Sequence, residues 1–118
     1  MSEPNESLTQ RLNSLASELQ RLGLWQEGRP SDEALSSTLP FCMDTLAFEQ
    51  WLQFVFIEQL QIMMQLGKPL PTNVAICPMA EEAFAHLGET AANVINIVAD
   101  IDELLSGKRQ QQNYIRTQ

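Results

Sequence analysis

The sequence predicts an all-α protein, a single bundle of four or five helices with one apolar helix at its centre. Leucines recur at helical spacing near the N-terminus, a very apolar segment fills the middle of the chain, and a second apolar repeat follows. Neither strand-type alternation nor an internal repeat is visible. The 118 residues, 44% of them hydrophobic, suffice for one domain with a sizeable core. We expect this domain at 1–107 and a disordered tail at 108–118.

The first expected helix starts near the N-terminus and ends at Gly23. Its apolar positions share one stripe because they are spaced by four, three, four and three residues: Leu8, Leu12, Leu15, Leu19 and Leu22. We predict that this stripe faces the core of the bundle. The alternative is a coiled-coil seam between two copies of the chain, which leaves a homodimer open.

A loop with a short helix is expected next. Ser31 can cap this helix because its side-chain oxygen can accept from the first turn. Pro40 is expected to end it, because proline disfavours helical backbone in the residue before it.

The central helix is expected from Thr45 to Leu66, capped by Asp44 or Thr45 and ended by Gly67. At about 100° per residue, apolar side chains cover more than half of its circumference. The buried arc would hold Phe48, Trp51, Leu52, Val55, Phe56, Leu60, Ile62, Met63 and Leu66. The remaining strip would hold Ala47, Gln50, Phe54, Glu58, Gln61 and Gln65. A helix with so wide an apolar arc packs against several others at once.

Residues 67–77 are too rich in proline for a helix and predict an extended crossover. Its apolar side chains should lie on the bundle surface: Leu70, Val74 and Ile76. Pro78 then starts a helix, which Gly88 breaks or bends. A last amphipathic helix begins at Glu89 and ends at Gly107.

The composition argues against direct binding to nucleic acid or to an anionic membrane. Seven Lys and Arg stand against fifteen Asp and Glu, a net charge of −8. Phosphate backbones are bound through Lys and Arg that displace counterions, so an acidic chain is a poor ligand for them. No secretory signal or membrane-spanning run is visible, which predicts a cytoplasmic protein. Cys42 and Cys77 are expected as reduced, buried thiols, with reactive thiols as the alternative.

A metal site and an enzymatic activity are not expected. Glu82 and His86 lie four residues apart on one helical face, and Glu58 lies on the apolar central helix. A zinc or iron site from these three is not predicted, because the chain has one histidine, at the wrong spacing for a carboxylate bundle. A phosphate-binding loop and a Ser/His/Asp set are also absent from the sequence, so no cofactor is predicted.

Several blocks of the sequence resemble the YqcC-like family of small bacterial proteins of unknown function. The blocks are Leu39-Pro40-Phe41-Cys42-Met43-Asp44-Thr45-Leu46, Phe48 to Ile57, Leu70-Pro71, and Ile76 to Ala83. The resemblance runs from Leu8 to Leu105 and implies an all-helical bundle in a cytosolic bacterial protein. It also implies a link to tRNA pseudouridine synthase of the C type, because members are often encoded beside it and some carry its name. It supplies no catalytic residues.

We therefore predict a non-catalytic cytosolic accessory module that binds another protein, with a tRNA pseudouridine synthase as candidate partner. The candidate contacts are Trp25, Trp51, Phe54, Glu58, Asp100 and Glu103. Asp100 and Glu103 fall on a solvent face that could dock a basic protein. Phe54 is either covered by the N-terminal helix or crossover, or exposed as an aromatic anchor. The alternative function is a bundle that binds an apolar small molecule among Phe41, Phe48, Trp51, Phe56 and Met63; a hydrolytic or redox enzyme ranks third.

Overall fold

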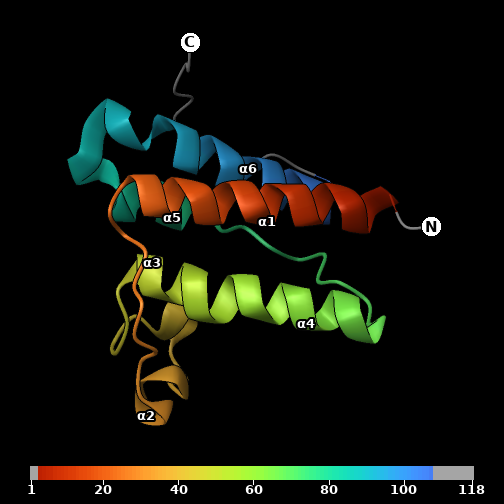
Figure 1. The fold of residues 1–118 in the computed structure, drawn as a ribbon, viewed down its shortest axis with the longest axis horizontal. Coiled ribbons are helices and arrows are strands. Elements are labelled where there is room, and N and C mark those ends of the chain that lie inside the picture. The colour runs from red at the N-terminus through yellow and green to blue at the C-terminus, as the bar shows by residue number, and fades with distance from the viewer. Residues whose placement is uncertain (1–2, 108–118) are drawn as a thin grey trace.

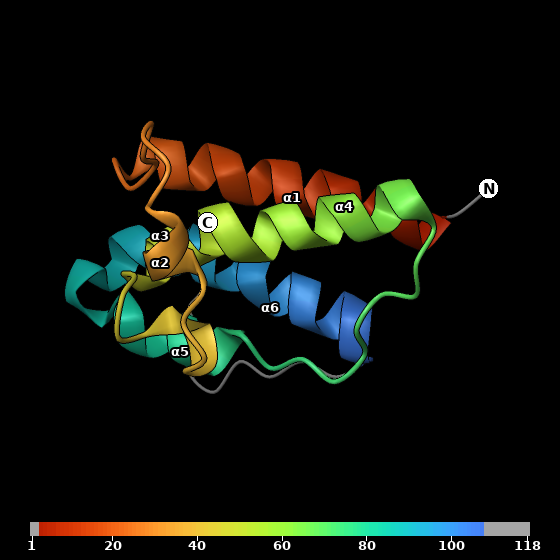
Figure 2. The ribbon, with the colours of Figure 1, turned by 90° about the horizontal axis from the view of Figure 1, so that it is seen from below.

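The computed structural model describes residues 3–107, and helices are the only regular secondary structure in that part of the chain. Three long segments lie side by side: α1 (Glu3–Arg21), a segment that ends in α4 (Glu58–Leu66), and α6 (Ala92–Ser106) (Figure 1, Figure 2). α4 and α6 run in the same direction, and α1 runs opposite to both. The predicted all-α bundle is confirmed. The tail at 108–118 lies outside the described residues.

The leucine stripe packs into the core of the single chain, as predicted, with four of its leucines buried and Leu22 partly buried. Leu8, Leu12, Leu15 and Leu19 are each at most 1% exposed, and α1 makes its most extensive contact with α6. Burying a leucine side chain is worth about 1.5–3 kcal/mol, so this stripe is a main source of stability.

Gly23 ends α1, which confirms that prediction. Its φ of +74° places it in the left-handed region that favours glycine. Two backbone bonds close the turn, from the N–H of Leu24 to the carbonyl of Leu19 (2.8 Å) and from Gly23 to Gln20 (3.1 Å). This pair of bonds is the Schellman arrangement, which satisfies carbonyls left over at the helix end.

The central helix contains a π-helical turn. It consists of α3 (Phe48–Trp51), the π turn η2 (Leu52–Ile57) and α4, and it ends at Gly67 as predicted. Its start differs from the prediction because neither Asp44 nor Thr45 caps it. Asp44 instead accepts a hydrogen bond from the Ser37 hydroxyl, and the Thr45 hydroxyl donates to the carbonyl of Ala34.

The cap position is Ala47, one residue before α3. The side-chain oxygen of Gln50 accepts from the backbone N–H of Ala47 at 2.7 Å, so the glutamine half of a capping box is present.

The π turn changes which face of the central helix is buried. Ile62 and Leu66, expected on the buried arc, are 46% and 62% exposed. Gln53 and Phe54 are buried instead, at 6% and 8% exposure. A π turn takes one more residue than an α turn, so every later side chain is rotated relative to the straight-helix projection. The predicted burial is confirmed for Phe48, Leu52, Phe56 and Leu60. It was wrong for Ile62, Leu66 and Phe54, for this reason.

Ser31 caps the short helix α2 (Asp32–Leu35) as predicted, by accepting from a backbone N–H three residues on. The helix ends well before Pro40, contrary to expectation. The backbone N–H and the hydroxyl of Ser36 both bond the carbonyl of Glu33. Serine competes in this way for carbonyls that would otherwise continue a helix. Pro40 instead begins a single 3-10 turn, η1 (Pro40–Cys42).

The crossover between α4 and α5 (Cys77–Ala83) has no regular secondary structure from Lys68 to Ile76, in agreement with the prediction. Its apolar side chains pack on the core, and Ile76 is 7% exposed. The crossover runs along the outside of the bundle between the ends of α4 and α5 (Figure 2).

Gly88 breaks the C-terminal half into separate helices. It lies inside η3 (Ala85–Ala91) with a φ of 59° and a ψ of −137°, which is not helical. α6 follows and ends at Gly107, as predicted. Over the described residues, no helix combines the length and apolarity that crossing a membrane requires.

Candidate protein interface

Three of the candidate contact residues meet in a groove between α1 and the central helix. The groove has a volume of about 320 Å³. It is lined by Leu12, Asn13, Ala16, Trp25, Gln53, Phe54, Ile57, Glu58 and Gln61. Phe54 is buried here, so the structure adopts the covered alternative for this side chain. The π turn explains its position, because it places Phe54 on the side of α1 rather than on a solvent strip.

A cluster of glutamines fixes the segment after α1 against the π turn. The buried amide of Gln53 accepts from the backbone N–H of Gln26 at 2.9 Å and donates to its carbonyl at 2.6 Å. Gln50 donates to the side-chain oxygen of Gln26 at 2.8 Å. One side chain thus satisfies both backbone groups of Gln26, as a neighbouring strand would. This position holds Trp25 at the edge of the groove.

Arg29 lies over the other side of the same groove. Its guanidinium is 2.7 Å from the Glu58 carboxylate and 5.9 Å from the centroid of the Phe54 ring. Both partners of the ion pair are partly exposed, so the pair is worth at most about 1 kcal/mol. Glu58 is therefore already paired within the chain.

We expect Gln53→Leu to lower the free energy of unfolding by about 1–3 kcal/mol, because both backbone groups of Gln26 lose their partner. Amide hydrogen exchange at Gln26, measured by NMR, should become much faster. Gln65→Leu, at an exposed position of the same helix, is the control and should change stability by less than about 0.5 kcal/mol. Unchanged exchange at Gln26 in Gln53→Leu would contradict the role of this amide.

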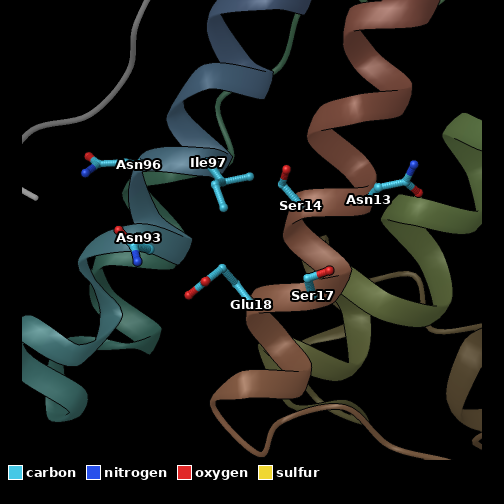
Figure 3. Close-up of a pocket in the computed structure, with 7 residues that line it drawn as sticks. All are labelled: Asn13, Ser14, Ser17, Glu18, Asn93, Asn96 and Ile97. Carbon is cyan, nitrogen blue, oxygen red and sulfur yellow. The ribbon is translucent and has the colours of Figure 1, made fainter.

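A second, shallower groove lies between α1 and α6, with a volume of about 430 Å³. It is lined by Asn13, Ser14, Ser17, Glu18, Asn93, Asn96 and Ile97. Glu18 reaches from α1 toward α6, and Ile97 faces Ser14 (Figure 3). Small polar side chains on α1 let the two helices approach, while the leucines of the stripe fill the interior.

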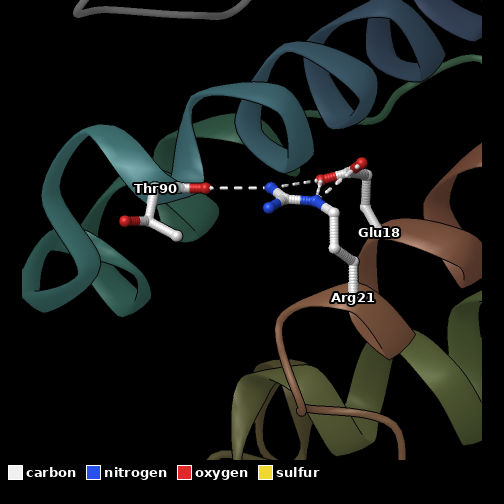
Figure 4. A network of polar contacts seen from close by, with 3 residues as sticks. All are labelled: Glu18, Arg21 and Thr90. Atoms are coloured by element: carbon white, nitrogen blue, oxygen red, sulfur yellow. Dashed lines mark hydrogen bonds and ion pairs between the residues drawn. The ribbon is translucent and has the colours of Figure 1, made fainter.

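Arg21 links the two helical segments at one end of this groove. It forms an ion pair with Glu18 at 2.8 Å and donates to the carbonyl of Thr90 at 3.3 Å (Figure 4). The contact ties the last turn of α1 to η3, just before the start of α6.

The two acidic candidates of α6 lie apart from Trp25 and Phe54. Asp100 is partly exposed and is 3.9 Å from Arg11 of α1, while Glu103 is exposed. The predicted solvent position is observed for Glu103 and partly for Asp100.

Trp51 belongs to an aromatic cluster at the start of the central helix. The centroid of its ring is 4.9 Å from that of Phe41, 5.9 Å from that of Phe48 and 5.4 Å from that of Phe56. Phe48 also contacts Phe84 at 5.6 Å. The rings pack on one another, and neither groove described above is lined by any of them. This packing gives no support to an apolar ligand among these rings.

Asp102 is a second buried polar residue, besides Gln53, that the sequence did not lead us to expect. It is 0% exposed, and its Oδ2 accepts from the backbone N–H groups of Ile76 (2.8 Å) and Cys77 (2.7 Å). Oδ1 has no hydrogen-bond partner among the described residues. Burial raises the pKa of Asp102, and the two backbone bonds partly oppose this shift. The carboxylate therefore caps the start of α5 from α6.

A signal for this burial was present in the sequence. Asp102 stands at helical spacing within an apolar stripe, beside Val98, Ile101 and Leu105, all of which are buried.

The residues considered for metal and thiol chemistry form no metal site among the described residues. Glu82 and His86 are exposed, and the described residues hold no group of three or more ligand side chains suited to a metal. Cys42 and Cys77 are both buried and form no disulfide, which agrees with structural thiols.

Comparison with known proteins places the fold. The solution structure of protein YqcC from Escherichia coli superposes with a TM-score of 0.79 over 99% of this chain and 100% of that one. The two chains are 24% identical over this match, so the match shows a shared helical fold.

Three relatives match this chain over different shares of their own length. An uncharacterized Haemophilus influenzae protein is 40% identical over 80% of this chain and 89% of its own. Escherichia coli YqcC, also uncharacterized, is 31% identical over 81% of this chain and 88% of its own. A Pectobacterium carotovorum protein named tRNA pseudouridine synthase C is 34% identical over 65% of this chain but only 20% of its own length.

The family model DUF446, described as tRNA pseudouridine synthase C, matches residues 7–104. This range contains the helices α2 to α5 and nearly all of α1 and α6. The chain therefore belongs to the YqcC-like family, a family of bacterial proteins of unknown function.

Proposed function

We propose that this protein is a non-catalytic accessory module that binds a tRNA pseudouridine synthase. The observation that carries the proposal is the Pectobacterium relative, in which a segment similar to this chain makes up a fifth of a protein named for that enzyme. The rest of that protein has no counterpart in the match. A segment similar to this domain and a much longer remainder thus share one polypeptide there.

Sharing a polypeptide has a physical consequence. Two modules joined by a linker meet at an effective concentration in about the millimolar range, so even a weak contact forms. A related domain on its own chain needs a contact surface to reach the same partner. The Haemophilus and Escherichia coli relatives match over nearly their whole length, so they offer little besides this domain.

Charge supports a protein partner over tRNA itself. The net charge of −8 repels a phosphate backbone. An enzyme that binds tRNA must present Lys and Arg, and an acidic protein is attracted to such a surface. Complementary charge of this kind speeds encounter and selects partners. The module would thus act on tRNA modification through the enzyme.

The test combines the protein with the tRNA pseudouridine synthase C of the same organism. We expect isothermal titration calorimetry to show a one-to-one complex, and gel-shift assays to show no binding of tRNA by this protein alone. We further expect no pseudouridine formation without the synthase. A bovine serum albumin titration controls for nonspecific association. Absence of a complex, or tight binding of tRNA by the isolated protein, would refute the proposal.

A further inference from the structure

The short loop from Leu39 to Met43 exposes apolar side chains at one end of the molecule. Leu39 is 47% exposed and Met43 is 54% exposed, and Phe41 between them is half-buried. Exposed apolar side chains that gather in one place mark contact sites more often than single ones do.

The backbone of this loop is held in an uncommon conformation. Phe41 and Cys42 have φ values of 60° and 50°, and among the described residues they alone combine a positive φ with a side chain. Such geometry is strained for residues with a side chain and persists only where its surroundings enforce it. Here the carbonyl of Cys42 accepts from the N–H groups of Thr45 and Leu46 at 2.9 and 2.8 Å. The loop is thus fixed before any partner arrives.

Contacts on both sides attach the loop to the bundle. The ring of Phe41 lies edge-on to Trp51, and Cys42 is buried. The Thr45 hydroxyl bonds the carbonyl of Ala34 at the end of α2. α2 and the loop therefore form one projection beside the start of α3 (Figure 1). A rigid projection loses little conformational entropy when it binds, which favours affinity.

The projection is surrounded by negative charge. Between Arg29 and Lys68 the sequence contains no Lys or Arg. Asp32, Glu33 and Asp44 lie on the projection itself and are exposed. The surface is apolar at its centre and acidic at its edge, the pattern of a protein interface that meets a basic partner.

We propose that the Leu39–Met43 loop and its acidic surroundings, residues 31–46, are the surface that binds the synthase. This inference rests on the proposed function and names the surface that carries it. The partner presents an apolar pocket or patch flanked by Lys and Arg of its tRNA-binding face. A second copy of this chain is a poor occupant, because each copy carries a net charge of −8.

The experiment measures the affinity of the full chain for the synthase by calorimetry. Leu39→Ser/Met43→Ser removes the apolar centre, and affinity should fall about tenfold or more. The matched control is Ile62→Ser/Leu66→Ser, which removes two comparably exposed apolar side chains from α4. Its affinity should equal that of the unmodified protein. Circular dichroism and urea unfolding confirm that each variant folds.

The charge component is measured separately. Asp32→Asn/Glu33→Gln should reduce the salt dependence of binding, whereas Glu89→Gln, at an exposed position outside the projection, should not. If the unmodified protein binds the synthase, and the loop variant and the control variant bind it with the same affinity as the unmodified protein, the proposal for this surface is refuted and the proposed function stands. If the loop variant changes self-association and leaves synthase affinity unchanged, the surface proposal is also overturned. If the unmodified protein does not bind, the proposed function fails and this surface with it.

Discussion

Replacing Asp102 by alanine should lower the free energy of unfolding by about 2 kcal/mol or more. The substitution leaves the N–H groups of Ile76 and Cys77 without their acceptor, and each buried, unpaired donor costs about 1–3 kcal/mol. No side chain of the turn itself caps α5, so the start of that helix would lose its main support. Urea unfolding followed by tryptophan fluorescence measures the loss.

Asp102→Asn is the control, because it keeps an acceptor oxygen and removes the charge. It should be less destabilising than alanine. A loss in Asp102→Ala no larger than in Asp102→Asn would contradict the capping role.

We also expect the stability difference between the unmodified protein and Asp102→Asn to depend on pH. The pKa of Asp102 is raised in the folded state, so the folded chain binds this proton more tightly than the unfolded chain does. In an unfolded chain an aspartate has a pKa of about 3.9. The contribution of Asp102 to stability is therefore fully present below that value and is lost as pH rises through the folded pKa. We expect unmodified protein to gain stability relative to Asp102→Asn on acidification. A difference that stays constant, or moves in the opposite direction, would rule out this coupling.

Phe84→Ala should be the most destabilising single substitution in the core, at about 3–5 kcal/mol. Phe84 is 1% exposed and is the largest of the fully buried side chains among the described residues. Its ring contacts Phe48, so truncation opens a cavity between the end of α5 and the aromatic cluster. Folded proteins are stable by only about 5–15 kcal/mol, so this loss brings the domain close to unfolding.

Chemical denaturation of two control variants tests whether the loss comes from the packing of the Phe84 ring. Phe84→Leu keeps much of the volume and should lose clearly less stability than alanine. Ala85→Ser, at the exposed neighbouring position, should change stability by less than about 0.5 kcal/mol. Equal losses for alanine and leucine would show that the ring does not fill this part of the core.

Helix positions could be predicted where one regular pattern decided them. The stripe of α1 has an unbroken helical spacing, and glycines with left-handed backbone end α1, α4 and α6. Local chemistry specifies these features, since glycine adopts this backbone without a steric penalty. The crossover could be read in the same way from its prolines.

The buried face of the central helix could not be predicted, because the projection assumed about 100° at every residue. The π turn at Leu52–Ile57 breaks that assumption. A π turn is stabilised by the packing around it, here including the bonds of Gln53 to Gln26, which lie 27 residues apart in the chain. Contacts of that range leave no local signal. The exposure of Ile62 and the burial of Phe54 follow from the same turn.

The candidate interface was predictable in part. Sequence reasoning placed Phe54 beside polar residues on one strip, and it named Trp25 and Glu58, which do share a groove with it. It could not find Arg29, which reaches the groove from a loop. It also could not find the left-handed backbone at Phe41 and Cys42, because neither position is a glycine.

The contact between α1 and α6 has a consequence for how this chain folds. The first helix packs mainly on the last described one, and about 70 residues separate the end of α1 from the start of α6. Contacts between distant segments form late, because the intervening chain must first give up its freedom. During synthesis the leucines of α1 therefore stay open to water until α6 has left the ribosome. The domain becomes stable in one cooperative step once α6 is available, and a fragment that stops before α6 exposes an apolar helix prone to aggregation.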